Sequence, residues 1–125
     1  MNIPNDLLYT SEHEWIRVEG GEAVVGVTDF AQGELGDVVF LEIETEGDTL
    51  DRGETFGTIE AVKTVSDLYM PVDGEVMAVN PALEDTPELV NTDPFGAGWM
   101  IRVRIADPDQ LEDLLSPEAY GELIS

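Results

Sequence analysis

The sequence has no cysteine, a single histidine, and only five basic residues against 28 acidic ones. Without cysteine there is no disulfide, no thiol nucleophile and no sign of secretion, and one histidine (His13) argues against a transition-metal site. No apolar run approaches the roughly 18 residues that span a bilayer, and the first residues do not resemble a signal peptide. We therefore expect a cytoplasmic protein with no metal site and no membrane partner.

The formal charge is −23 for 125 residues. This excludes nucleic acid as a partner, because phosphate binding needs a basic surface. An acidic disordered chain is disfavoured by the apolar segments, and a single acidic docking face by the even spread of the acids. Adaptation to a cytoplasm with molar salt, where the screening length falls to about 3 Å, explains the charge better. The sequence predicts a halophilic, salt-accumulating source and, from self-repulsion, a monomer.

The apolar pattern predicts a single domain over 1–125 that is dominated by β-strands. Residues 15–18 and 23–27 form a hairpin pattern, and 100–105 alternates with Ile101, Val103 and Ile105 inward. We expect a β core at about 22–105 and a helical segment at 106–125, with helices at about 108–124. A brief helix should begin at 28–32 and end near Gly33 or Gly36.

A weak internal repeat is also present. Residues 36–38 (Gly-Asp-Val) recur in similar form at 74–76, and a second set recurs with identical internal spacing: Leu50, Phe56 and Gly57 at Leu89, Phe95 and Gly96. A true repeat would give two halves of similar shape, with the connection between them at Lys63.

Lys63 is the only lysine of the chain. Residues 59–61 and 68–72 fit two strands, so Lys63 is expected at the tip of a hairpin. Its amine can form an amide, a Schiff base or an ion pair, whereas arginine could form only the last. A catalytic Schiff-base lysine needs a desolvated pocket, while Glu60 and Asp67 nearby favour the charged amine. This setting favours a modification target; a solvated lysine, an enzyme using Lys63, and an acidic interaction protein without cofactor are the alternatives.

The residues around Lys63 resemble the lipoyl-attachment motif of the glycine cleavage system H protein family. The motif spans residues 60–67 (Glu-Ala-Val-Lys-Thr-Val-Ser-Asp), and further matches lie at 13–15, 26–32, 35–37, 56–57, 71–74, 79–81 and 98–100. Biotin carriers and the lipoyl domains of 2-oxo acid dehydrogenases differ beside the lysine, at Val62 and Thr64. The resemblance implies a lipoyl/biotinyl-type flattened barrel-sandwich hybrid with Lys63 at a hairpin tip.

The resemblance also implies a carrier protein and not an enzyme. (R)-lipoate would be attached covalently to Lys63 by a lipoate ligase or lipoyl transferase. Glycine decarboxylase (P protein) would load an aminomethyl group, which an aminomethyltransferase (T protein) would remove. Dihydrolipoamide dehydrogenase (L protein) would then accept the electrons. An H-like protein that relays lipoate to other pathways is the alternative within the same fold.

Carboxylates near the lipoyl-lysine arm would stabilise its cargo, the aminomethyl group. An aminomethyl nitrogen held as an ammonium cannot use its lone pair to expel the sulfur, and carboxylates can hold it there. By resemblance, Glu14 and Asp67 are the residues expected in this cleft, with Glu12 a weaker candidate; each could instead be a solvated surface acid. His13 is expected to be structural, beside Trp15, so the sequence predicts no catalytic residue.

Overall fold

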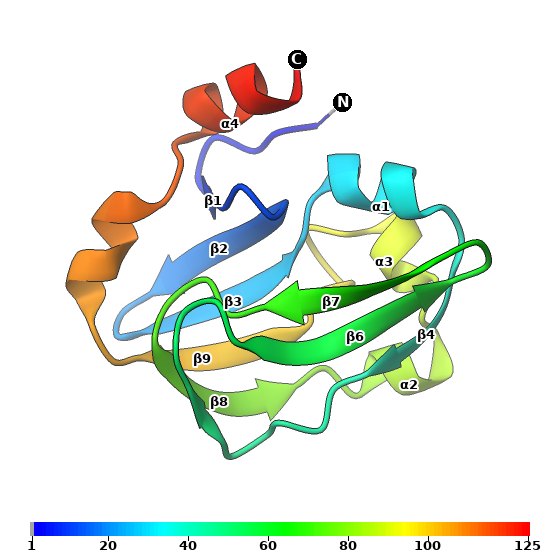
Figure 1. Cartoon of the computed structure of the whole chain (residues 1–125), viewed down its shortest axis with the longest axis horizontal. Helices are drawn as coiled ribbons and strands as arrows, with labels where there is room; N and C mark the ends of the chain where they lie inside the picture. Colours follow the sequence, from blue (N-terminus) through cyan, green and yellow to red (C-terminus); the bar gives the residue numbers. More distant parts are fainter. Residues whose placement is uncertain (1) are drawn as a thin grey trace.

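The computed structural model describes residues 2–125 as two antiparallel β-sheets that face each other (Figure 1). The strands of the large sheet run in the order β1 (Leu8–Tyr9), β2 (Glu14–Glu19), β3 (Glu22–Val27), β9 (Ile101–Ile105), β8 (Gly74–Val79) and β5 (Thr49–Leu50). Those of the small sheet run in the order β4 (Val38–Glu42), β6 (Thr55–Ala61) and β7 (Val65–Tyr69). The predicted β-dominated fold with short helices is confirmed.

The core fills the space between the sheets. In the large sheet Ile16 pairs with Val25, and Val25 with Ile101, so one row of side chains points inward. In the small sheet Leu41 and Ile59 form the facing row, and all five are buried. Ile101 and Val103 point inward as predicted, because residues two apart on a strand share a face.

Short helices lie around the sheets: α1 (Asp29–Leu35), α2 (Ala82–Asp85), α3 (Leu89–Thr92), the 3₁₀ helix η1 (Pro108–Asp113) and α4 (Pro117–Ile124). The Thr28 hydroxyl caps α1 by accepting from the Ala31 N–H, and Ser116 caps α4 by accepting from Ala119. The helices expected at 108–124 are present, although the first is 3₁₀. Helix α1 passes Gly33 and ends at Gly36, which has a φ of 80°.

A second apolar cluster lies on the outer side of the large sheet, where Trp15 packs with Tyr9 and Tyr120. The tyrosine rings stack at 4.7 Å and hold α4 against β1. The Trp15 indole crosses Gly26, where a Cβ atom would lie 2.7 Å from the ring. His13 does not pack beside Trp15 as expected; its ring meets Phe30, and its Nδ1 shares a 3.0 Å hydrogen bond with the Tyr120 hydroxyl.

Two expectations are wrong, one about where the β core begins and one about the internal repeat. The β core begins well before residue 22, because β1 and β2 are strands of the large sheet. The second part of the repeat has no structural counterpart, since Leu50 lies in β5 whereas Leu89 lies in α3.

Within residues 2–125, no helix is both long and apolar enough to cross a membrane.

Candidate functional site

Lys63 lies in the turn of the β6–β7 hairpin, which runs across the front of the molecule and extends outward at its tip (Figure 1). The Ala61 N–H donates to the Thr64 carbonyl at 2.8 Å and closes the turn. The Val62 N–H donates to the Asp37 carbonyl at 3.0 Å and ties the tip to the segment before β4. Lys63 is exposed, so its amine is accessible to other proteins.

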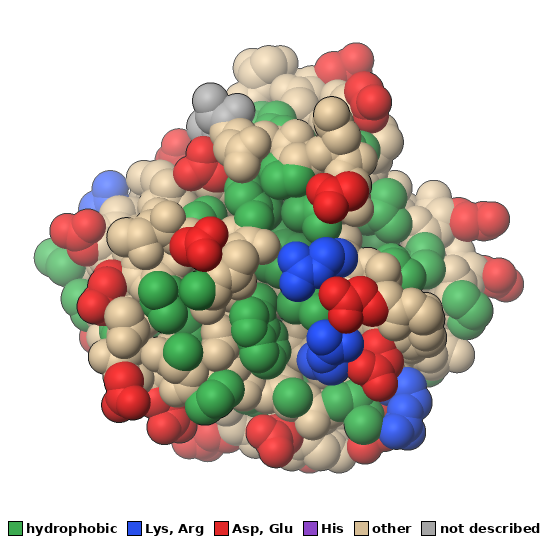
Figure 2. All heavy atoms as spheres, turned by 180° about the vertical axis from the view of Figure 1, so that it is seen from behind, with side chains coloured by type: hydrophobic (Ala, Val, Ile, Leu, Met, Phe, Trp, Pro, Cys, Tyr) green, Lys and Arg blue, Asp and Glu red, His purple; other side chains and the backbone are tan. Residues whose placement is uncertain are grey.

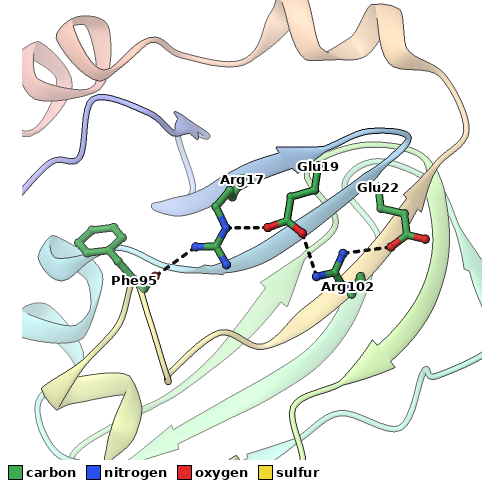
Figure 3. Close-up of polar contacts among 5 residues, drawn as sticks. All are labelled: Arg17, Glu19, Glu22, Phe95 and Arg102. Carbon is green, nitrogen blue, oxygen red and sulfur yellow. Dashed lines mark hydrogen bonds and ion pairs between the residues drawn. The ribbon is translucent and has the colours of Figure 1, made fainter.

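The other basic side chains of the described residues all form ion pairs. Arg102 contacts Glu19 at 3.0 Å and Glu22 at 3.1 Å, and Arg17 reaches the same Glu19 at 3.1 Å (Figure 3). Elsewhere Arg104 pairs with Glu75 and Arg52 with Asp113. Most of these arginines gather on the outer face of the large sheet (Figure 2). Within residues 2–125, no ion pair involves Lys63.

The Lys63 side chain lies across Gly36, at the end of α1. A Cβ atom at Gly36 would come within 3.2 Å of Lys63 Cε and 3.7 Å of Nζ, so a glycine lets the side chain lie close. The Asn91 side chain fixes this segment: its amide donates to the Gly36 carbonyl and its oxygen accepts from the Val38 N–H, both at 2.8 Å. The lysine stem therefore has a defined path along the end of α1.

A cavity of about 460 Å³ opens beside this path, between α1, β7 and the start of β2. Leu35 and Ser66 lie at the end of the cavity nearest the hairpin tip, next in sequence to Gly36 and Val65. Tyr69 lies at the far end of β7, and Glu14 lies at the start of β2. Its lining combines an apolar set (Val27, Phe30, Ala31, Leu35, Ile59 and Leu68) with a polar set (Glu12, His13, Glu14, Glu34, Ser66, Asp67 and Tyr69). The three carboxylates expected from the sequence thus line one cavity.

Glu14 differs from the other two acids because it is buried, with 2% of its surface exposed. Its Oε2 accepts from the Tyr69 N–H at 2.8 Å and its Oε1 from the Thr10 hydroxyl at 3.2 Å, so it links the two sheets. Burial raises the pKa of Glu14 to about 8, although both hydrogen bonds oppose the shift. Glu12 and Asp67 are exposed.

A second cavity, of about 370 Å³, continues the first, since Glu12, Glu14 and Tyr69 line both. It leads toward Arg52 and the segment after η1. Sequence reasoning missed this groove and the Tyr69 N–H, because nothing in the sequence brings Tyr69 to Glu14. It indicated Gly36 as a possible helix end but not as a contact of Lys63.

This arrangement suits acylation by a visiting enzyme. An exposed amine at a tip can enter another protein's active site, and the cavity beside it can shelter whatever the amine then carries. The crystal structure of a glycine cleavage system H protein from Mycobacterium marinum has a similar fold, with a TM-score of 0.86 at 40% identity over 96% of this chain and 98% of that one. The fold is therefore the barrel-sandwich hybrid of lipoyl-type carriers.

Sequence comparisons identify the family within that class. The family model for glycine cleavage H-protein matches residues 7–125. The glycine cleavage system H proteins of Bacteroides thetaiotaomicron and Salinibacter ruber are each 58% identical, the first over 100% of this chain and 99% of the relative, the second over 98% and 99%. This chain belongs to the glycine cleavage H-protein family, the lipoyl carriers of glycine cleavage.

Proposed function

We propose that Lys63 is the point at which (R)-lipoate is attached as an amide, by a lipoate ligase or lipoyl transferase. The observation that carries this proposal is an exposed amine, without an ion pair in the described residues, at a hairpin tip beside a cavity. When bound, the group supplies a dithiolane that accepts an aminomethyl group and two electrons.

The residues present fit such a group. The lysine stem lies across Gly36, which is next in sequence to Leu35 of the cavity lining. Apolar side chains such as Phe30 and Leu68 can cover an aliphatic chain that lies in the cavity.

Glu14, Asp67 and, more weakly, Glu12 would hold the cargo nitrogen as an ammonium at the acidic part of the cavity. Glu14 uses its two oxygens for Tyr69 and Thr10, and each oxygen has a further lone pair available. An arriving ammonium would favour the ionised form of Glu14, since an opposite charge offsets the cost of burying the carboxylate.

We propose a carrier role and not an enzymatic one. An active-site lysine acts from a desolvated pocket, whereas Lys63 is exposed at the tip. The partners are then glycine decarboxylase, which loads the arm, the aminomethyltransferase, which unloads it, and dihydrolipoamide dehydrogenase, which reoxidises it.

The test is the intact mass of the chain after coexpression with a lipoate ligase. We expect one lipoyl adduct on the wild type and none on Lys63→Arg. Arg104→Lys is the matched control, because it places a second exposed amine on the outer face of the large sheet, and it should still carry one adduct, on Lys63. An adduct at position 104 of that variant, or none on the wild type, would reject the assignment.

We further propose that the protein works as a monomer in a cytoplasm of high salt. The charge of −23 supports this, because self-repulsion destabilises both the folded domain and any self-contact in dilute buffer. The melting temperature should rise steeply from dilute to molar KCl. The protein should sediment as a monomer at every KCl concentration in this range. A melting temperature that does not depend on salt would contradict the proposal.

A further inference from the structure

Exposed apolar side chains gather around the hairpin tip. Among residues 2–125, the large apolar side chains that remain exposed are Val18, Val39, Phe40, Val62, Val65 and Leu123. Four of these belong to β4 or to the β6–β7 hairpin, with 47% of Val39, 52% of Phe40, 75% of Val62 and 62% of Val65 exposed. Single exposed apolar residues are ordinary, but a cluster marks an interaction site.

The strand register joins two of them into one row. Phe40 pairs with Glu60, and Glu60 pairs with Val65, so the three side chains cross the small sheet on the same face. The next row, Leu41–Ile59–Ser66, points to the opposite face, where Leu41 and Ile59 are buried in the core. The Phe40 row therefore faces away from the body of the protein.

A bulge in β4 and the turn extend this surface toward the lysine. Val39 lies where the register between β4 and β6 shifts, and Val62 is next to Lys63 in the turn. We call the surface formed by Val39, Phe40, Glu60, Val62 and Val65 the tip face.

None of the tip-face residues lines the cavity. On the hairpin the cavity is lined by Ile59 and by residues 66–69, whereas Phe40, Glu60 and Val65 form the outward row nearer the tip. A protein docked on the tip face can reach Lys63 and still leave the cavity open.

We propose that the tip face is the docking surface for glycine decarboxylase, an inference that rests on the proposed function. The enzyme that loads the arm needs the cavity free, so that the loaded arm can fold into it before the two proteins separate. An enzyme that removes the cargo has no such need. The partner surface is an apolar depression rimmed by arginine or lysine, because exposed acids (Asp37, Glu42 and Glu60) lie among the apolar side chains.

The test uses fully lipoylated chains, verified by intact mass, as substrates of purified glycine decarboxylase. Phe40→Ser and Val65→Ser should each raise the KM for the carrier by about tenfold with little change in kcat, since an apolar anchor in a docking surface is worth about that much. Glu60→Lys should raise the KM more at low salt than at high salt. Val18→Ser and Leu123→Ser remove exposed apolar side chains elsewhere, 41% and 49% exposed, and should leave the KM unchanged.

Reduction of the dithiolane by a small phosphine, measured without enzyme, should be the same for all these variants and shows that the arm itself is intact. An unchanged KM for Phe40→Ser and Val65→Ser, or an equal rise for Val18→Ser, would overturn the proposal. The proposal would also be overturned if the wild type formed a dimer that Phe40→Ser dissociates without changing the KM. The tip face would then bind a second copy of the chain. A lipoylated wild type that the decarboxylase does not load would instead reject the proposed function itself.

Discussion

The two ends of strand β2 place the same residue type in opposite environments. Glu14, at the cavity end, is buried and accepts hydrogen bonds only from neutral groups. Glu19, at the other end, is exposed and pairs with Arg17 and Arg102. Burial raises the pKa of Glu14 to about 8, whereas the two arginines lower the pKa of Glu19. In a chain with 28 acids, the surroundings and not the residue type distinguish a candidate functional carboxylate from a structural one.

The largest expected effect comes from Glu14→Gln. Between pH 4.5 and about pH 8 the folded wild type binds a proton that the unfolded chain has lost, so its stability falls as the pH rises through this window. Glutamine keeps the size and the acceptor for Tyr69 but cannot ionise. Relative to the wild type, the variant should gain stability on the order of 3–5 kcal/mol between pH 4.5 and pH 9. Urea unfolding at a series of pH values measures this difference.

The same substitution should shorten the lifetime of the aminomethyl-loaded protein while leaving lipoylation intact. Glu75→Gln is the control for both measurements, since it removes a half-buried acid of the large sheet that does not line the cavity. A stability difference between Glu14→Gln and the wild type that stays constant with pH would show that Glu14 is not held neutral.

A smaller effect is expected at the path of the lysine stem. Gly36→Ala and Gly20→Ala both place a side chain at positive φ, 80° and 67°. Gly20→Ala should lose about 1 kcal/mol of stability, and Gly36→Ala should lose more, because its ψ of −157° lies in a region that only glycine adopts readily. Only the alanine at 36 would also meet Lys63, because nothing lies within 4 Å of a Cβ atom at Gly20. In the lipoylated protein, Gly36→Ala should therefore speed phosphine reduction of the dithiolane about two- to threefold by shifting the arm out of its cavity. If phosphine reduced the dithiolane at equal rates in the two variants, Gly36 would be needed only for its backbone conformation and not for the position of the Lys63 side chain.

The smallest effect is expected for Glu19→Gln, and it should have the opposite sign from Glu14→Gln. Because the pKa of Glu19 is lowered in the folded state, its stabilising effect is present above the unfolded pKa and disappears as the pH falls through the folded one. The variant should be slightly less stable than the wild type near neutral pH and equal to it in acid. Molar KCl should remove the difference, since the pairs are exposed. A loss that grows with salt would contradict this view of the arginine cluster.

The sequence predicted best what depends on local pattern. The β2–β3 hairpin follows from alternation and a glycine turn, and the position of Lys63 at a tip follows from two short strand patterns. The cavity depends on contacts between distant segments. Glu14 shares the inward side of β2 with Ile16, so alternation could have indicated its burial, but not its bond to Tyr69, 55 residues away. The bulge that leaves Val39 and Phe40 exposed has no sequence signal that we can name.

The stack of Tyr9 on Tyr120 has a practical consequence for experiments with several enzymes. It brings the first and last segments together, where Ile3 and Ile124 pack on the same cluster, and both termini leave the molecule on one side while the hairpin extends on another (Figure 1). A linker fused to the last residue, or a bead coupled there, would leave Lys63 and the hairpin tip unobstructed. Tethered assemblies in which carrier and enzyme share one scaffold can therefore be built from the carboxyl terminus.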